Sequence, residues 1–226
     1  MSEASAAVTS LLPGWARGEL AATCSWADDE RRRYPWSGAL HFADTPGDCQ
    51  FFYGRDCHNM KGEKDMCVVG GINNYTAALT NSSAPLVDPT ISLMFLAHFV
   101  GDVHQPLHRV WDLDIIEKAM KDFYNDDLSI MTHVIMQNIT EAWSEEEREW
   151  EACSSRTKTC ADKYAMESAQ LACDVAYAGV EQGSILGDDY FFSTLPVVQK
   201  RIAQGGVRLA AILNKIFGES SKPHSS

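Results

Sequence analysis

The feature that most constrains this chain is an apolar run that leads directly into a group of histidines and aspartates. Residues 91–97, Ile-Ser-Leu-Met-Phe-Leu-Ala, are almost wholly apolar, and residues 98–112 then contain three histidines and two aspartates. A helix with such an apolar run is buried, and burial of imidazole and carboxylate groups is costly unless each is paired or bound to a metal ion. The segment therefore predicts a buried helix that carries a functional site.

The spacing of these polar residues indicates a metal site. His98 and Asp102 are four residues apart, so on a helix they project from one face a single turn apart, as two ligands of one metal ion must. His108 and Asp112 repeat the spacing. The alternative is that these are ordinary buried polar residues satisfied by hydrogen bonds, but the repetition favours metal binding. His104 fits neither pair, and we expect it to orient a ligand or to cap the helix end.

The rest of the chain favours helices. Helical periodicity or composition extends over residues 114–124, 128–150, 160–180 and 197–217, and convincing alternating strands are absent. We therefore predict an all-α fold in one domain, residues 1–217, with a disordered tail at residues 218–226. No apolar run approaches the roughly 18 residues that a membrane span needs, so we expect no membrane contact, and we expect a monomer.

The composition is typical of a secreted protein. Seven cysteines accompany three sequons, at Asn74, Asn81 and Asn138, which together predict disulfide bonds and glycosylation. Residues 1–13 nevertheless contain no basic segment, continuous apolar core or clear cleavage site, so no signal peptide is visible. The odd number of cysteines leaves one thiol unpaired.

The formal net charge of -12 limits the kind of partner. A protein that held nucleic acid by covering many phosphates with lysine and arginine would be basic. If this chain acts on phosphodiesters, cations held in a local pocket must supply the positive potential, and zinc would do so.

A second group of polar residues lies upstream. Asp28 and Arg31 follow Trp26, and the motif Leu-His41-Phe42-x-Asp44 comes shortly after. The charged run from Asp28 to Arg31 could simply be a solvated helix end. His41 is harder to explain in this way, because it lies between apolar neighbours and needs a partner.

Together with the motifs at residues 95–108 and 110–112, these residues resemble the plant and fungal single-strand-specific, zinc-dependent nucleases, also called 3'-nucleotidase/nucleases, and most closely the plant bifunctional nucleases. The resemblance extends through residues 200–208 to the last helix. It implies an all-α fold similar to that of zinc-dependent phospholipases C, with three zinc ions. It also implies hydrolysis of single-stranded DNA and RNA to 5'-phosphates, 3'-nucleotidase activity, and a secreted or vacuolar location.

The resemblance also implies roles for particular residues. It assigns one zinc to Asp28, His41, His98 and Asp102, with Asp102 bridging to another zinc, and a more distant zinc to His108 and Asp112. It assigns phosphate contact to Arg31, base stacking to Phe42 and hydrogen bonding of the base to Asp44, which makes Arg31 and Asp44 the expected catalytic residues. Nitrogen and oxygen ligands of this kind suit zinc.

Two parts of the family pattern are missing from this sequence. The family's mature chain begins with a tryptophan and a histidine that bind zinc, whereas this chain enters the pattern near Leu11. A glycine-rich segment flanked by two histidines is also missing. His108 therefore corresponds to both of these histidines and can fill the position of only one. We therefore expect fewer than three zinc ions. One alternative to an active nuclease is an impaired or inactive product of splicing or of a gene-prediction error. A third possibility is a zinc-dependent phospholipase C.

The resemblance further implies a disulfide pattern. It pairs Cys49 with Cys173, Cys57 with Cys67, and Cys153 with Cys160. It leaves Cys24 unpaired, because the partner of that cysteine lies in the missing first helix. A structural zinc at Cys57 and Cys67 is the weaker alternative, since no second cysteine or histidine pair is near them in the sequence.

Overall fold

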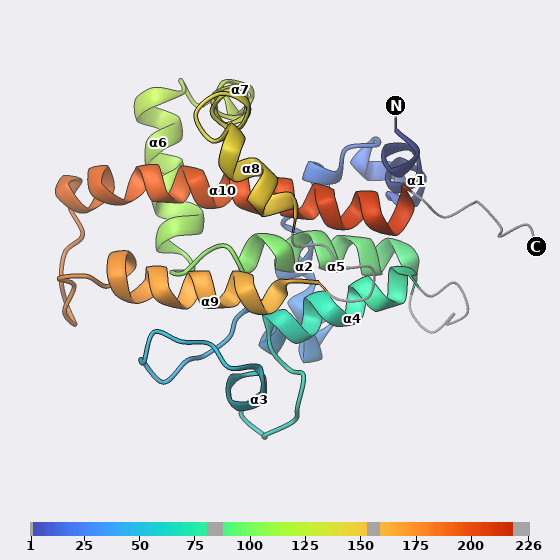
Figure 1. Ribbon diagram of the computed structural model, residues 1–226, viewed down its shortest axis with the longest axis horizontal. Helices are drawn as coiled ribbons and strands as arrows, with labels where there is room; N and C mark the ends of the chain where they lie inside the picture. The colour runs from blue at the N-terminus through green and yellow to red at the C-terminus, as the bar shows by residue number, and fades with distance from the viewer. Residues whose placement is uncertain (1, 81–87, 153–158, 219–226) are drawn as a thin grey trace, which may run out of the picture.

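The computed structural model describes residues 2–80, 88–152 and 159–218, and within these ranges the chain forms helices joined by turns (Figure 1). The all-α prediction is confirmed, since the described residues form no strand and His58 and Lys64 make only an isolated bridge. The α-helices are α1 Glu3–Leu11, α2 Trp26–Asp29, α3 Tyr53–Asp56, α4 Val68–Thr80, α5 Pro89–Asp102, α6 Ile115–Phe123, α7 Leu128–Thr140, α8 Ser144–Glu151, α9 Ala161–Leu171 and α10 Asp188–Phe217. Short 3-10 helices, η2 Leu20–Thr23, η3 Glu30–Arg32 and η4 Pro35–His41, and two π-helical turns, η5 Val110–Asp114 and η6 Ala172–Ala176, connect them.

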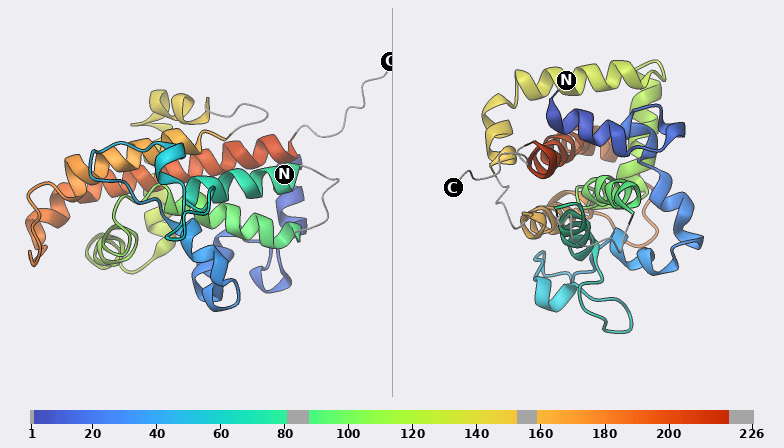
Figure 2. Two further views of the ribbon diagram at one scale, coloured as in Figure 1. Left: turned by 90° about the horizontal axis from the view of Figure 1, so that it is seen from below. Right: turned by 90° about the vertical axis from the view of Figure 1, so that its right-hand side faces the viewer.

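The long helix α10 organises the fold. It runs across the whole molecule and contacts α1, α4, α5, α6, α7 and α8 (Figures 1 and 2). Helix α4 packs against both α5 and α9, so α5 is enclosed between α4 on one side and α10 and α1 on another. Among the described helices, none combines the length and the apolar character that crossing a bilayer requires.

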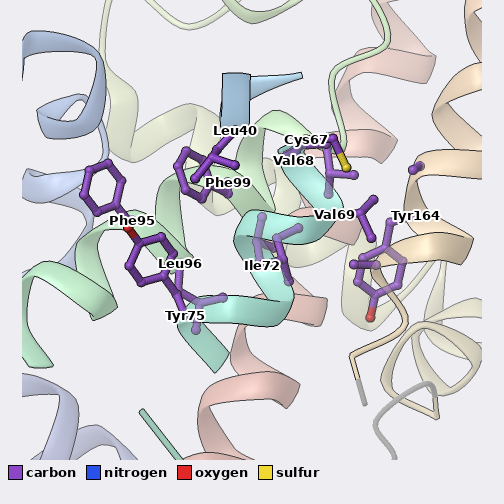
Figure 3. Packing of buried hydrophobic residues seen from close by; sticks show 14 of the residues in the cluster. Leu40, Cys67, Val68, Val69, Ile72, Tyr75, Phe95, Leu96, Phe99 and Tyr164 are labelled. Atoms are coloured by element: carbon purple, nitrogen blue, oxygen red, sulfur yellow. The ribbon is translucent and has the colours of Figure 1, made fainter. Parts of the chain in front are cut away.

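Helix α5 is the buried helix that the sequence predicts. Asp88 caps its start by accepting a hydrogen bond from the Thr90 backbone N–H at 2.8 Å, and Pro89 occupies the first position, where its missing N–H costs nothing. Every residue in the range 92–100 is buried. The Phe95 ring of α5 stacks on the Tyr75 ring of α4 within the core (Figure 3). Gly71 permits this close packing, because a Cβ there would lie 2.9 Å from the Phe99 ring.

The other predicted helices appear with different limits. The range 114–124 becomes α6, whereas 128–150 divides into α7 and α8 around a turn at residues 141–143. The range 160–180 ends at the π-helical turn η6. Helix α10 begins at Asp188, well before residue 197. It continues through Pro196, although a proline usually interrupts a helix.

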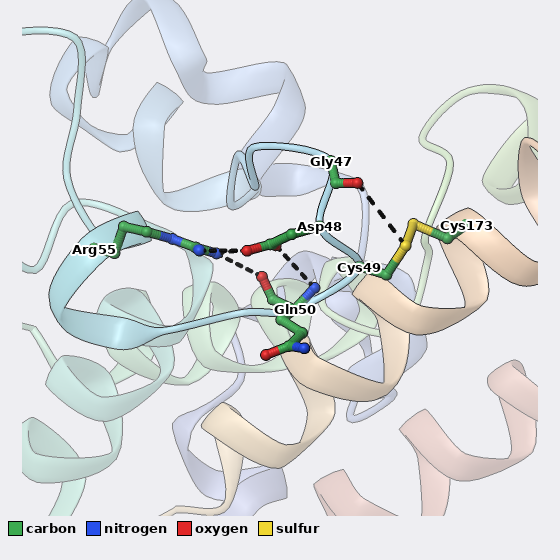
Figure 4. Close-up of a disulfide and its surroundings, with 6 residues drawn as sticks. All are labelled: Gly47, Asp48, Cys49, Gln50, Arg55 and Cys173. Atoms are coloured by element: carbon green, nitrogen blue, oxygen red, sulfur yellow. Dashed lines mark hydrogen bonds and ion pairs between the residues drawn. A yellow bond between two sulfur atoms is a disulfide. The ribbon is translucent and has the colours of Figure 1, made fainter.

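The cysteines pair as the family resemblance implies, where they are described. Cys49 pairs with Cys173, which ties the loop after η4 to η6 (Figure 4), and Cys57 pairs with Cys67. The disulfide between Cys57 and Cys67 rules out the structural-zinc alternative at these two residues. Cys24 carries a free, exposed thiol. The third predicted pair is Cys153 with Cys160, and Cys153 lies outside the described residues.

The three sequons and the predicted tail lie in different surroundings. Asn74 is exposed on α4 and Asn138 is half-buried on α7, while Asn81 lies outside the described residues. Except for Gly218, the predicted tail at residues 218–226 is also outside them.

A buried ionic network joins α5, α9 and α10. Glu167 accepts two hydrogen bonds from the Arg208 guanidinium, at 2.6 and 2.8 Å, and one from Arg201 at 2.9 Å. Burial raises the pKa of Glu167, but the two guanidinium groups outweigh burial and hold it below its ordinary value. His104 donates from Nδ1 to the Val100 carbonyl and accepts at Nε2 from Arg208, so it caps the end of α5, which was one of the two roles expected.

This network predicts that Glu167→Gln destabilises the protein by about 2–4 kcal/mol at pH 7, because two buried arginines lose their counter-charge. Since the pKa of Glu167 is lowered by folding, its contribution is present above pH 4.5 and is lost as pH falls through the folded-state pKa. Urea unfolding of both proteins should therefore give stabilities that converge in acid. Glu149→Gln, at an exposed position on α8, is the control and should change stability by less than about 0.5 kcal/mol. An equal loss in both variants would contradict the account.

Candidate metal centre

Four of the predicted ligand residues converge beside the C-terminal half of α5. His98 and Asp102 project from that helix one turn apart. Asp28 comes from α2 and His41 from the end of η4, two short elements that both pack against α5. The sequence separates the two pairs by more than fifty residues, so the fold is what brings them together.

Three of these side chains form a compact triangle of potential ligand atoms. His41 Nδ1 lies 3.0 Å from Asp102 Oδ2, His98 Nε2 lies 3.1 Å from the same oxygen, and the two nitrogens are 3.0 Å apart. A tetrahedral zinc ion with ligands at 2.0–2.2 Å requires ligand atoms about 3.4 Å apart. The triangle is therefore slightly tighter than one face of such a tetrahedron.

Asp28 approaches the two imidazoles of this triangle. Its Oδ1 is 3.6 Å from His41 Nδ1 and its Oδ2 is 3.7 Å from His98 Nε2. Ligand atoms of Asp28, His41 and His98 all lie within 4.8 Å of one another. The donor set of two imidazoles and two carboxylates matches the preference of zinc for nitrogen and oxygen ligands, so the residues present fit one zinc ion. We refer to Asp28, His41, His98 and Asp102 as the four-residue cluster.

The hydrogen bonds of the two imidazoles orient them toward the cluster. His98 Nδ1 donates to the Cys24 backbone carbonyl at 2.5 Å, which fixes one proton there and leaves Nε2 free to face the other ligands. His41 directs Nδ1 at the cluster, and its Nε2 is buried without a hydrogen-bond partner among the described residues. The role of the Cys24 carbonyl has no sequence signature, because any residue can supply a backbone carbonyl.

The cluster changes the protonation of its members. Burial lowers the pKa of His98, but the hydrogen bond to Asp102 and the nearby carboxylates outweigh burial, so the pKa is raised. For Asp102, burial raises the pKa and the two histidines lower it by more. Both shifts favour a protonated His98 next to an ionised Asp102.

The three predicted substrate-contact residues are exposed, and Arg31 contacts the cluster. Arg31 donates from Nη2 to Asp28 Oδ1 at 2.7 Å, and its side chain is 52% exposed. Phe42 follows His41 directly and is 44% exposed. Asp44 is exposed two residues later, in the extended segment that leaves η4.

The second predicted pair lies outside the group of close ligand atoms, although Asp102 and Asp28 act electrostatically on His108. His108 Nδ1 lies 3.2 Å from Asp112 Oδ2, and both side chains are more than one-third exposed. Burial lowers the pKa of His108, but its hydrogen bond to Asp112 and the charges of Asp102, Asp112 and Asp28 together outweigh burial, so the pKa is raised. Within the described ranges, no third metal-binding side chain joins this pair. Arg109, between the two residues, has φ 70°, a strained conformation for a residue with a side chain.

Comparison with known proteins identifies the class. The geometry alone defines a helical protein with a buried histidine–aspartate cluster. The chain matches the S1/P1 nuclease family over residues 1–110 and 107–218, so it belongs to the S1/P1 nuclease family. This membership makes it a nuclease by descent and favours that class over the phospholipase C reading.

Individual relatives agree with this assignment. The chain is 44% identical to Endonuclease 2 of Arabidopsis thaliana over 244 residues, which cover 95% of this chain and 84% of the relative. It is 28% identical to Nuclease P1 of Penicillium citrinum, over 88% of this chain and 85% of the relative. It is 25% identical to Nuclease S1 of Aspergillus oryzae, over 89% of this chain and 80% of the relative.

The comparisons also bear on the internal segment that the sequence predicts to be missing. The alignment with Endonuclease 2 is longer than this chain of 226 residues, so the relative has residues without a counterpart here. The two family matches meet at residues 107–110, which include His108 and the strained Arg109. This is the junction at which the sequence predicted that a glycine-rich segment is absent.

The cluster predicts how zinc affinity should respond to mutation and pH. His98→Ala should weaken zinc binding by at least roughly 100-fold, because it removes one of four converging ligands. Affinity in the unmutated protein should fall as pH decreases through the raised pKa of His98, since zinc must displace the proton on Nε2. Competition with a chromophoric chelator measures both effects.

The matched control for this experiment is His108→Ala, which removes a histidine four residues from an aspartate outside the cluster. It should change the affinity of the tightest site by less than about threefold. Equal losses in the two variants would contradict the assignment of the tight site to the four-residue cluster.

Proposed function

We propose that this chain is a zinc-dependent endonuclease that hydrolyses phosphodiester bonds of single-stranded DNA and RNA, leaves 5'-phosphate products and also removes 3'-phosphates from nucleotides. The observation that carries the proposal is the close approach of Asp28, His41 and His98, whose ligand atoms lie within 4.8 Å of one another, with Asp102 Oδ2 within 3.1 Å of both imidazoles. Family membership makes nucleic acid the expected substrate.

The roles of the four ligands follow from their geometry. Both imidazoles contact the same oxygen of Asp102, Oδ2. The other carboxylate oxygen is therefore available to a second cation or to a water molecule. Zinc bound at the cluster would lower the pKa of a bound water to about 7 and would polarise a phosphoryl oxygen. The Cys24 carbonyl holds His98 in the tautomer that can bind the ion.

The exposed neighbours supply the contacts with substrate. Arg31 has N–H groups directed toward solvent that can donate to phosphoryl oxygens and stabilise negative charge in the transition state. Phe42 presents an exposed ring next to the cluster, on which an unpaired base can stack. Asp44 can accept hydrogen bonds from that base. Since bases in a duplex already stack on one another, this arrangement favours single strands.

We place the protein in the secretory pathway or the vacuole. Two disulfide bonds support an oxidising compartment, and the exposed sequon at Asn74 is accessible to glycosylation. The negative net charge keeps nonspecific binding to nucleic acid weak, so recognition depends on the metal and on the local contacts.

A second candidate function has its own observation. His108 and Asp112 form an exposed pair that lacks a third ligand among the described residues, at the junction where the two family matches meet. A chain that binds one zinc ion but does not turn over substrate is consistent with this. The two candidates make the same prediction for zinc binding and opposite predictions for hydrolysis.

Hydrolysis of a fluorescently labelled single-stranded oligonucleotide tests the proposal. The chain with zinc should give products with 5'-phosphate ends, whereas Asp102→Asn should lose both zinc and at least roughly 1,000-fold in rate. Glu145→Gln, an exposed acidic residue on α8, should change neither and serves as the control.

The outcome separates the two candidates. Full zinc binding without hydrolysis would support the second candidate, and insertion between His108 and Arg109 of the corresponding residues of Endonuclease 2 should then restore turnover. Loss of zinc without loss of rate in Asp102→Asn would contradict the first candidate.

A further inference from the structure

The Asp28 carboxylate serves two partners at once. Its Oδ1 pairs with the Arg31 guanidinium at 2.7 Å and is also the oxygen that lies 3.6 Å from His41 Nδ1. Its Oδ2 faces His98 Nε2 at 3.7 Å. A cation in the four-residue cluster would therefore approach a carboxylate that already has a positive partner.

The distances suggest that Arg31 holds Asp28 away from the centre of the cluster. Asp102 reaches the two histidine nitrogens at 3.0 and 3.1 Å, whereas Asp28 stays at 3.6 and 3.7 Å. The side chain of Asp28 is 51% exposed and that of Asp102 is 14% exposed. Asp28 is thus the loosest of the four ligands, at the open edge of the cluster, where Arg31 contacts it.

The charges make simultaneous binding unfavourable. A divalent ion at the cluster and a guanidinium on the same carboxylate would lie within several ångströms of each other and would repel. Arg31 has a half-exposed side chain, so it can turn outward at little cost. Once turned outward, its planar fork of N–H donors would face a phosphate that approaches the metal.

We propose that Arg31 and the metal ion compete for the Asp28 carboxylate, so that binding of the ion releases the guanidinium for a substrate phosphate. This inference rests on the proposed zinc site. Arg31 then acts as a positioning residue in the metal-free protein and contacts phosphate only when the ion is present. The substrate-binding arginine becomes available at the same time as the metal that activates the reaction.

Zinc affinity measured without any phosphate or nucleic acid tests the competition. Arg31→Met keeps the length of the side chain and removes the charge, so zinc should bind about 3- to 10-fold more tightly at low ionic strength. Arg31→Lys keeps the charge and should stay within about twofold of the unmutated protein. Arg32→Met removes a neighbouring exposed arginine that has no ion pair with Asp28 and should also have little effect.

Each result has a distinct meaning. Weaker zinc binding in Arg31→Met would overturn the competition and would show that Arg31 orients Asp28 for the ion. Unchanged binding would overturn it as well, and would restrict Arg31 to phosphate contact. If none of the proteins bound zinc, including the unmutated one, the zinc site itself and the proposed function would fail together.

Discussion

The structure depends on the burial of His98 and Asp102 at the end of an otherwise apolar helix. Burial of an imidazole and a carboxylate is favourable only when both are fully partnered. Here His41 contacts the Asp102 carboxylate, and the Cys24 carbonyl accepts a hydrogen bond from His98. The close approach of α4 at Gly71 keeps α5 enclosed. The short elements α2 and η4 are thereby fixed against α5, and with them the residues around the cluster.

Two polar networks lie at the same end of α5, and their charge balance distinguishes their roles. Around Glu167, one carboxylate accepts hydrogen bonds from two guanidinium groups, and the neutral His104 accepts another from Arg208. The four-residue cluster instead combines two carboxylates with two imidazoles, each of which has one nitrogen directed at Asp102 Oδ2. The first network stabilises the packing of α9 and α10 against α5, whereas the second brings together nitrogen and oxygen atoms that can bind a cation.

Much of this could be predicted from the sequence, because the strongest signals are local. The apolar run at residues 91–97 and the four-residue spacing of His98 and Asp102 define a buried helix with two inward ligands. Helix limits were less predictable: α10 continues through Pro196 because contacts with several other helices outweigh the local cost of a proline.

Long-range contacts were predictable only through family resemblance. The convergence of Asp28 and His41 on α5, and the pairing of Cys49 with Cys173, depend on tertiary packing that no spacing rule encodes. The Glu167 network was missed, although Arg201 and Arg208 are seven residues apart and so lie on one face of a helix. That spacing was the available signal, and an acidic partner on another helix was its natural complement.

X-ray absorption spectroscopy of the protein with one equivalent of zinc tests the central claim most directly, because it reports the atoms bound to the ion. The account predicts about four nitrogen and oxygen neighbours at roughly 2.0–2.2 Å, with the multiple-scattering pattern of two imidazoles. A sulfur neighbour near roughly 2.3 Å, as the free Cys24 would give, or a shell of six oxygens without imidazole, would contradict it.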